Sequence, residues 1–373
     1  MPAKVEHTPL RVELLVSGVR ISDSLPAGSK APHRVRSGSC GGLDLVLPDG
    51  RYVNAPVREH FVAQSPFRIR FDDDCIEVVN DDTGESVPVS VSNAPAYYQD
   101  KVCTSGRKMV QVGQICSDRL GIGLTNRCTF WSHKSERCTF CSIGLNVDSG
   151  AEVRNKDVDE IAEVVDVAVV DPVLPARHIL LGGGTPPGSD AGARMIALAA
   201  ATIKERHPEV PIYAMIVPPE DRRWIARLRE AGVDELGMNV EMFSDEAGIA
   251  YLPGKHRRIG LTGYLSALAS AVDVFGPVHT RSIVMVGLEP AEHSIRGAER
   301  LASMGVMPIL TPFRPLVGTP MEHHERMPAK DVWRLTVEAA DAVSQHRIPL
   351  GPTCIPCQSN TLTTGSHPLY RYY

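Results

Sequence analysis

The chain has 373 residues, of which 43% are hydrophobic and 22% are charged, values that are ordinary for a soluble globular protein. Its 39 Lys and Arg residues against 44 Asp and Glu residues give a formal net charge of −5, which disfavours broad nonspecific binding to nucleic acid. No apolar run approaches the ~20 residues that span a bilayer, and the first residues lack the apolar segment of a secretory signal. We therefore expect a cytoplasmic protein that does not insert into a membrane.

Residues 1–110 differ in pattern from the rest of the chain. Residues Arg11–Val16 and Phe67–Phe71 run apolar or alternate as strands do, and turn signals such as Pro48-Asp49-Gly50 separate such segments. This pattern predicts a small β-rich N-terminal domain over residues 1–110.

Residues 111–346 show alternating strand and helix patterns. Apolar positions spaced as on one helix face fall between short apolar runs, for example Val158, Ile161 and Val165. The predicted strands are Leu120–Leu124, His178–Leu181, Ile212–Val217, Glu235–Val240, Ser282–Val286 and Met307–Leu310. Repeated βα units favour a parallel sheet covered by helices. We predict an α/β fold with a partial (β/α)6 TIM-type barrel, whose chemistry lies at the carboxyl ends of the strands. A Cys-bearing C-terminal tail over residues 347–373 follows.

Three cysteines directly after the first predicted barrel strand form the strongest chemical signal. Nine residues separate Cys128 from Cys138, and two separate Cys138 from Cys141. Three thiolates can hold three irons of a [4Fe–4S] cluster and leave the fourth iron open to another ligand. Zinc is the main alternative, with His133 as a fourth ligand, because structural zinc usually takes four ligands. Uncoordinated buried thiols are the other alternative.

The triplet, with Phe140 just before its last cysteine, resembles the radical SAM superfamily. The usual motif of that superfamily has three residues in the first gap, and this chain departs from it with nine. The overall layout is also similar to a radical SAM family associated with nitrilase gene clusters. The resemblance implies that Cys128, Cys138 and Cys141 hold a [4Fe–4S] cluster, and that Phe140 packs near the adenine of S-adenosylmethionine.

Later segments extend the resemblance along residues 120–320. Gly182, Gly183, Gly184 and Thr185 follow the second predicted strand, where the superfamily has a glycine-rich segment that meets the amino group of S-adenosylmethionine. An ordinary turn is the alternative there, although glycine does permit a close backbone approach. The Gly318-Thr319-Pro320 ending of the sixth strand also resembles biotin synthase.

Residues on the fourth strand, in the basic stretch that follows it and on the fifth strand match elements of biotin synthase and lipoyl synthase. By that resemblance Asn239 and Glu241 contact the ribose and methionine portions of the cofactor, and Val286 packs against its adenine. Arg258, with Arg257 as the alternative, pairs with the cofactor carboxylate. Solvated polar residues at a strand end, and a solvated basic turn, are the alternatives. We expect the Lys255–Arg258 stretch to open a helix.

The resemblance implies an enzyme that cleaves S-adenosylmethionine reductively and forms a 5′-deoxyadenosyl radical, which abstracts hydrogen from a substrate. The implied partners are a small-molecule or cofactor-biosynthesis substrate and a one-electron donor such as flavodoxin or ferredoxin. Modification of a peptide or RNA, sulfur insertion and a non-catalytic metal-binding module are alternatives, and nucleic acid is disfavoured by charge. The residues acting directly on the substrate are unknown from the sequence.

Cys354 and Cys357 lie in the tail at a spacing that often binds metal. Two ligands do not complete a site, so Cys103 or Cys116 is expected to join them if the tail folds back. A second Fe–S cluster, a zinc ion and two reduced thiols all remain open. We expect Cys40 and Cys75 to be inert core thiols.

Overall fold

The computed structural model describes residues 7–21, 28–30, 41–72, 75–365 and 367–373. Its first element corrects the sequence prediction, because residues Leu10–Ser17 form helix α1 and not a strand. Leu14, Leu15 and Val16 are consecutive buried residues, a pattern that a strand with one exposed face does not allow. Gly18 ends the helix with a φ of 74°.

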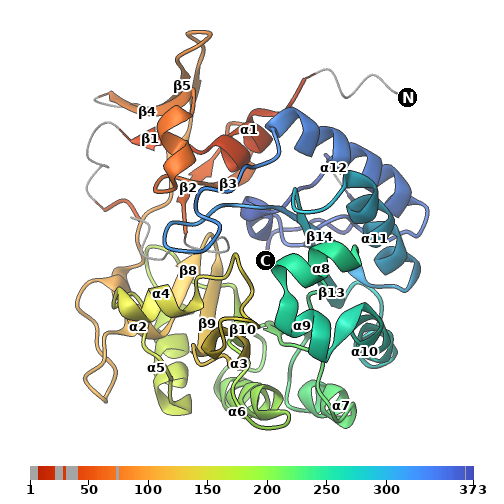
Figure 1. Cartoon of the computed structure of the whole chain (residues 1–373). Helices are drawn as coiled ribbons and strands as arrows, with labels where there is room; N and C mark the ends of the chain where they lie inside the picture. Colours follow the sequence, from red (N-terminus) through yellow and green to blue (C-terminus); the bar gives the residue numbers. More distant parts are fainter. Residues whose placement is uncertain (1–6, 22–27, 31–40, 73–74, 366) are drawn as a thin grey trace.

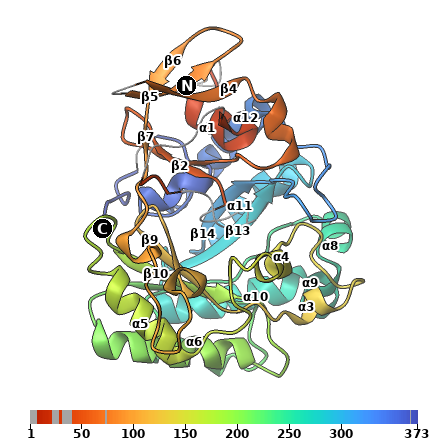
Figure 2. The ribbon, with the colours of Figure 1, turned by 90° about the vertical axis from the view of Figure 1, so that its left-hand side faces the viewer.

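Two small sheets follow and account for the β-rich character of the N-terminal region (Figures 1 and 2). One has the order β1-β4-β5-β6, with bounds Arg20–Ile21, Phe67–Asp72, Cys75–Asn80 and Ser86–Pro88. The other has the order β3-β2-β7, with bounds Tyr52–Ala55, Leu43–Val46 and Ser90–Val91. The predicted strand Phe67–Phe71 lies within β4 and is confirmed. Cys75 is exposed, so the prediction of a core thiol is wrong there, and Cys40 lies outside the described residues.

A seven-stranded sheet of order β14-β13-β12-β11-β10-β9-β8 forms the rest of the fold. Strands β9 to β14 are parallel to one another, and β8 pairs antiparallel with β9 at one edge. The bounds are Gln114–Cys116 for β8, Arg119–Thr125 for β9, His178–Gly183 for β10, Ile212–Met215 for β11, Glu235–Gly237 for β12, Thr280–Val286 for β13 and Met307–Pro312 for β14. The six parallel strands confirm the predicted partial barrel, although β11 and β12 end two and three residues earlier than expected.

Helices connect the parallel strands and form an arc around the outside of the sheet (Figure 1). The main ones are α5 (Val158–Ala168), α6 (Ala191–Arg206), α7 (Arg223–Glu230), α10 (Gly260–Phe275), α11 (Ala291–Ser303) and α12 (Ala329–Ser344). Shorter helices are α2 (Met109–Val112), α3 (Thr129–Ser132), α4 (Ile143–Asp148), α8 (Asp245–Tyr251) and α9 (Pro253–Arg258), and the 3-10 helices are η1 (His60–Gln64), η2 (Ala96–Tyr98) and η3 (Pro356–Asn360). The stretch Lys255–Arg258 closes α9 and does not open a helix, because Pro253 occupies the first turn.

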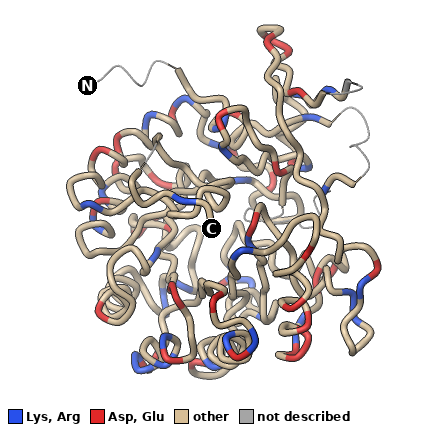
Figure 3. The backbone as a smooth tube through the Cα atoms, turned by 180° about the vertical axis from the view of Figure 1, so that it is seen from behind, with Lys and Arg blue, Asp and Glu red and all other residues tan. Residues whose placement is uncertain are grey.

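The core lies between the sheet and these helices, and the central strands are buried on both faces. Every residue from Leu120 to Thr125 of β9 is buried, as expected for a parallel strand covered on both sides. Among the described residues, no helix is long and apolar enough to cross a membrane. Positive and negative residues are interspersed over the outer helices (Figure 3).

The C-terminal residues fold back onto the barrel and the N-terminal sheets. The Leu362 N–H donates to the Leu310 carbonyl of β14 at 2.8 Å, and the Arg11 guanidinium of α1 donates to the carbonyls of Gln358 and Thr361. Helix η3 also packs on β3. The division at residues 110 and 346 stays a prediction.

Candidate active site

A cavity of about 370 Å³ opens at the carboxyl ends of the parallel strands. Residues at or just after the ends of these strands line it, namely Thr125, Gly183, Met215, Asn239, Met285 and Pro312. Its volume lies within the range of ~300–1,000 Å³ that is typical of small-molecule sites. This is the end of the barrel where the sequence analysis predicts the chemistry.

Cys128, Cys138 and Cys141 all line this cavity, so the structure brings the predicted triplet together. Cys138 and Cys141 share one tight turn, in which the Cys141 N–H donates to the Cys138 carbonyl at 3.2 Å. Burial raises the pKa of the Cys138 thiol well above its ordinary value, and the neighbouring Cys141 and Cys128 add to the shift. Each thiolate charge makes it harder for the neighbouring thiols to ionise. A bound metal cation would offset these charges, so the arrangement suits a metal site.

The nine-residue gap in the triplet contains helix α3 and a short loop. The guanidinium of Arg137 stacks 3.9 Å from the ring centroid of Trp131 and donates to the Trp131 carbonyl. This contact keeps the segment between Cys128 and Cys138 compact, so the two cysteines reach the same cavity although nine residues separate them. His133 is exposed and does not line the cavity, so the geometry gives no support to it as a fourth metal ligand.

The predicted glycine-rich segment packs directly against the cysteine loop. Gly182, Gly183, Gly184 and Thr185 line the cavity, and the Thr185 carbonyl accepts from the Thr129 N–H at 2.8 Å. Gly183 has a φ of 134°, which favours glycine. A Cβ at Gly184 would lie 2.2 Å from the Arg127 carbonyl oxygen and 3.0 Å from the Cys128 Cβ. The glycines therefore bring the end of β10 close to Cys128.

Asn239 and Glu241 also line the cavity, in the segment that follows β12. The Asn239 Oδ1 accepts from the Ile283 N–H of β13 at 3.2 Å, which fixes the orientation of this side chain. Glu241 has a φ of 68°, a left-handed conformation that costs a non-glycine residue energy. Backbone bonds to both Ile283 and Met285 hold it there.

Lys255 is a cavity residue that the sequence analysis missed. Its Nζ lies 2.9 Å from Glu241 Oε2, and the two side chains are only 17% and 12% exposed. Burial lowers the pKa of Lys255, but Glu241, Tyr264 and Cys138 more than compensate and hold it well above the ordinary value. The ammonium group therefore stays protonated at neutral pH beside the cysteines.

Three other predicted residues differ in their placement. Phe140 lines the cavity as expected. Arg258 is 45% exposed, pairs with Glu136 and does not line the cavity. Val286 is 1% exposed in the hydrophobic core and does not line it either. The geometry thus supports Lys255, and not Arg258, as a cation of the cavity, whose lining also includes the buried Arg314.

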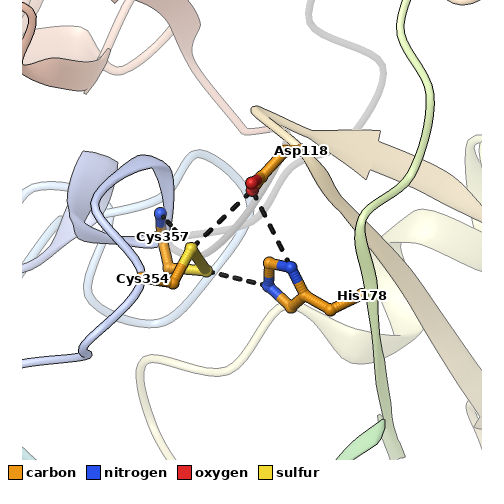
Figure 4. Close-up of side chains that lie close together, drawn as sticks. All are labelled: Asp118, His178, Cys354 and Cys357. Carbon is orange, nitrogen blue, oxygen red and sulfur yellow. Dashed lines mark hydrogen bonds and ion pairs between the residues drawn. A yellow bond between two sulfur atoms is a disulfide. The ribbon is translucent and has the colours of Figure 1, made fainter. Parts of the chain in front are cut away.

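Cys354 and Cys357 lie elsewhere, at the amino ends of the strands, together with Asp118 and His178 (Figure 4). The expected partners do not join them. The Cys116 Sγ lies 3.8 Å from an Asp44 carboxylate oxygen, and the Cys103 Sγ lies 4.0 Å from the Glu160 carbonyl oxygen.

Residues 124–297 match the model of the radical SAM superfamily. The chain is 30% identical over 223 residues to a bacteriochlorophyllide c C-7(1)-hydroxylase of Chlorobaculum limnaeum, with 56% of this chain and 54% of that protein covered. The chain thus spans about half the length of this curated relative.

Solved structures are also similar to this chain. Methylornithine synthase is 17% identical with a TM-score of 0.46, and 64% of each chain is covered. The FeFe-hydrogenase maturase HydG of Carboxydothermus hydrogenoformans is 16% identical with a TM-score of 0.45, and 62% of this chain and 52% of that chain are covered.

The superfamily implies a [4Fe–4S] cluster and S-adenosylmethionine, and the residues present fit both. Three cysteines line one cavity, the glycine segment touches the Cys128 loop, and the cavity extends beyond the cysteines to Asn239 and Glu241. Residues 124–297 thus form a radical SAM domain, and this domain together with the enzymatic relative shows that the chain is an enzyme.

Proposed function

We propose that this enzyme cleaves S-adenosylmethionine reductively and acts on a small-molecule or cofactor-biosynthesis substrate. The observation that carries the proposal is the convergence of three cysteines, the glycine segment and two polar residues on one cavity. When bound, the cluster and S-adenosylmethionine supply an electron and a 5′-deoxyadenosyl radical that abstracts hydrogen from the substrate.

The residues of the chain hold and orient these groups. Cys128, Cys138 and Cys141 would hold the cluster through their three thiolates, and the cavity beside them would receive S-adenosylmethionine. Gly182–Thr185 present backbone polar groups that suit the amino group, and a Glu241 carboxylate accepts hydrogen bonds from ribose hydroxyls. The Lys255 ammonium adds positive charge near the thiolates.

A compact substrate is favoured over a peptide or RNA. The cavity is of small-molecule size, and the outer helices carry mixed charge (Figure 3). The relative from Chlorobaculum limnaeum is named for a reaction on bacteriochlorophyllide, which favours a substrate from cofactor biosynthesis. A one-electron donor such as flavodoxin or ferredoxin belongs to the same proposal.

Sulfur insertion from an auxiliary cluster at Cys354 and Cys357 is disfavoured by distance. Strand β9 has 7 residues and separates the two cysteine groups. At the rise of an extended strand this places them about 20 Å apart. A sulfur donor has to touch the carbon radical, so the pair is too far away to serve as one.

The test compares the variant Cys128→Ser/Cys138→Ser/Cys141→Ser with Cys75→Ser, which removes an exposed thiol distant from the cavity. After anaerobic reconstitution, we expect about four irons per chain in the wild type and the control, and none in the triple variant. Formation of 5′-deoxyadenosine under reducing conditions should follow the iron. Reductive cleavage that persists in the triple variant would refute the proposal.

A further inference from the structure

We propose that Asp118, His178, Cys354 and Cys357 bind one structural Zn²⁺ ion at the amino ends of the barrel strands. One ligand atom from each side chain lies within 4.8 Å of the others. Two sulfurs, one nitrogen and one oxygen form a donor set that zinc takes in tetrahedral sites. The close-up in Figure 4 shows all four side chains directed at one another.

The four residues come from three separate parts of the chain. Asp118 directly precedes β9, His178 begins β10, and the two cysteines flank the start of η3. Adjacent parallel strands bring the first two together, because Arg119 and His178 are paired residues in the sheet. The C-terminal residues then cross beneath the sheet and supply the sulfurs.

The distances suit a small tetrahedron. The Cys354 Sγ lies 3.8 Å from Asp118 Oδ1. One of the two ring nitrogens of His178 binds the ion; Nε2 lies 2.9 Å from the Cys357 Sγ, and Nδ1 lies 4.0 Å from the same Asp118 Oδ1. Tetrahedral zinc with ordinary bond lengths separates its ligand atoms by about 3.4 to 3.8 Å. Small side-chain adjustments therefore suffice to admit the ion.

Burial favours a metal over solvent at this place. His178, Cys354 and Cys357 are 5%, 1% and 4% exposed, and the ring of Tyr373 covers His178 at 4.9 Å between centroids. Among the described residues, the His178 Nδ1 has no hydrogen-bond partner although it is buried. A buried imidazole nitrogen without a partner costs folding energy unless a ligand satisfies the ring.

The structure joins Cys354 and Cys357 in a disulfide, which is an alternative state of the same residues. A thiol reductant converts it to two thiols by delivering two electrons and two protons, and the thiols release both protons when Zn²⁺ binds. The disulfide alone gives no reason for a buried histidine and a carboxylate to converge on the sulfurs, whereas a metal ion requires them.

The role of the ion follows from its position. The site lies at the end of the barrel opposite the candidate active site, where residues serve stability in barrels of this kind. Backbone bonds link residues Thr353 and Ile355 to Arg371, so the ion would fasten two C-terminal segments to β9 and β10. We therefore expect it to hold the C-terminal region on the barrel.

The test measures metals in the reduced full-length protein. The wild type, purified anaerobically with a thiol reductant and supplied with ZnSO₄ before desalting, should retain about one zinc ion per chain. Zinc should fall below ~0.1 ions per chain in Cys354→Ser/Cys357→Ser, and Cys75→Ser should keep it. The triple variant Cys128→Ser/Cys138→Ser/Cys141→Ser should lose iron and keep zinc, so this proposal and the proposed function can fail separately.

Cobalt replacement tests the ligands without relying on the folding of a variant. Co²⁺ added to the metal-free wild type should give thiolate-to-metal charge-transfer bands and the visible bands of a tetrahedral site, and Zn²⁺ should abolish both. His178→Asn should weaken Co²⁺ binding about 10- to 100-fold. Zinc content unchanged by loss of both cysteines, iron in place of zinc, or a disulfide that persists under reductant with no metal bound would overturn the proposal.

Discussion

Two groups of cysteines lie at opposite ends of the same parallel strands. Cys128, Cys138 and Cys141 line an open cavity at the carboxyl ends, whereas Cys354 and Cys357 are buried against His178 at the amino ends. The first group has three sulfurs and space beside them; the second has four mixed ligands and no comparable space. An open coordination position suits catalysis, and a closed ligand set suits structure.

The largest expected effect comes from a substitution at Gly184, which lies close to the cysteine loop and should affect the first group of cysteines alone. In Gly184→Ala the new methyl group lies 2.2 Å from a backbone oxygen of Arg127, so the end of β10 or Cys128 has to move. We expect a loss of about 3 kcal/mol of stability, the upper end for overpacking, and a cluster that loads in only a minority of chains. Iron content and thermal unfolding measure both effects.

Gly182→Ala is the matched control, because its new methyl group meets neighbours only at 3.5 Å or more. It should load iron as the wild type does. Zinc bound at the amino ends should be unchanged in both variants. Full iron loading in Gly184→Ala would show that the glycine segment does not position Cys128.

The next effect compares two of the cationic residues of α9, Lys255 and Arg258. In Lys255→Met the Glu241 carboxylate loses its partner, which we expect to cost about 2–3 kcal/mol, since a fully buried pair costs ~3–5 kcal/mol and this one is partly exposed. Because the pKa of Lys255 is raised, the ion pair stabilises the fold in full at neutral pH. This stabilisation is lost only as pH rises beyond the ordinary pKa of lysine. Urea unfolding at pH 7 and at pH 11 measures the difference.

Arg258→Met is the control, because its ion pair with Glu136 is solvent-exposed and contributes ~0–1 kcal/mol. Lys255→Met/Glu241→Gln should recover part of the lost stability, since it removes both charges. We also expect Lys255→Met to weaken S-adenosylmethionine binding more than Arg258→Met does. If a binding titration showed the larger loss of affinity in Arg258→Met, Arg258 would be the residue that pairs with the cofactor carboxylate, as the family resemblance implies.

The barrel strands could be predicted from the sequence because a parallel strand buried on both faces is a short continuous apolar run. Residues Arg11–Val16 have the same appearance, but there the run is one side of a short helix that Gly18 terminates. Composition over six residues does not distinguish these cases. The cysteine and glycine motifs could be predicted because each follows directly on a strand.

The remaining site residues depend on contacts that the sequence does not display. Lys255 and Arg258 lie three positions apart on α9, and only the packing of that helix decides which one reaches the cavity. Asp118 and His178 are ordinary polar residues at the starts of two strands, and Cys354 follows more than a hundred residues later. Their meeting is a consequence of the parallel pairing and the returning tail.

The smallest effect concerns the cost of an empty metal site. Burial raises the pKa of Asp118 to about 6, although Arg119 and Arg177 lower it. A raised pKa means that the folded protein holds the proton more tightly, so this group favours folding at low pH and the benefit is lost as pH rises through about 6. At pH 8 the metal-free protein therefore bears a buried carboxylate charge, and Asp118→Asn should stabilise it by about 1–2 kcal/mol.

With zinc bound, we expect Asp118→Asn to destabilise the protein and not to stabilise it. With the ion bound, the carboxylate is a ligand, and Asp118→Asn should lower both zinc affinity and the thermal stability of the zinc-loaded protein. Asp171→Asn is the control: backbone N–H donors outweigh burial and lower the pKa of Asp171, so its removal should destabilise the protein with or without zinc. A carboxylate that binds zinc destabilises the metal-free protein and stabilises the zinc-bound protein. Equal effects of Asp118→Asn on the stability of the two forms would therefore show that Asp118 is not a zinc ligand.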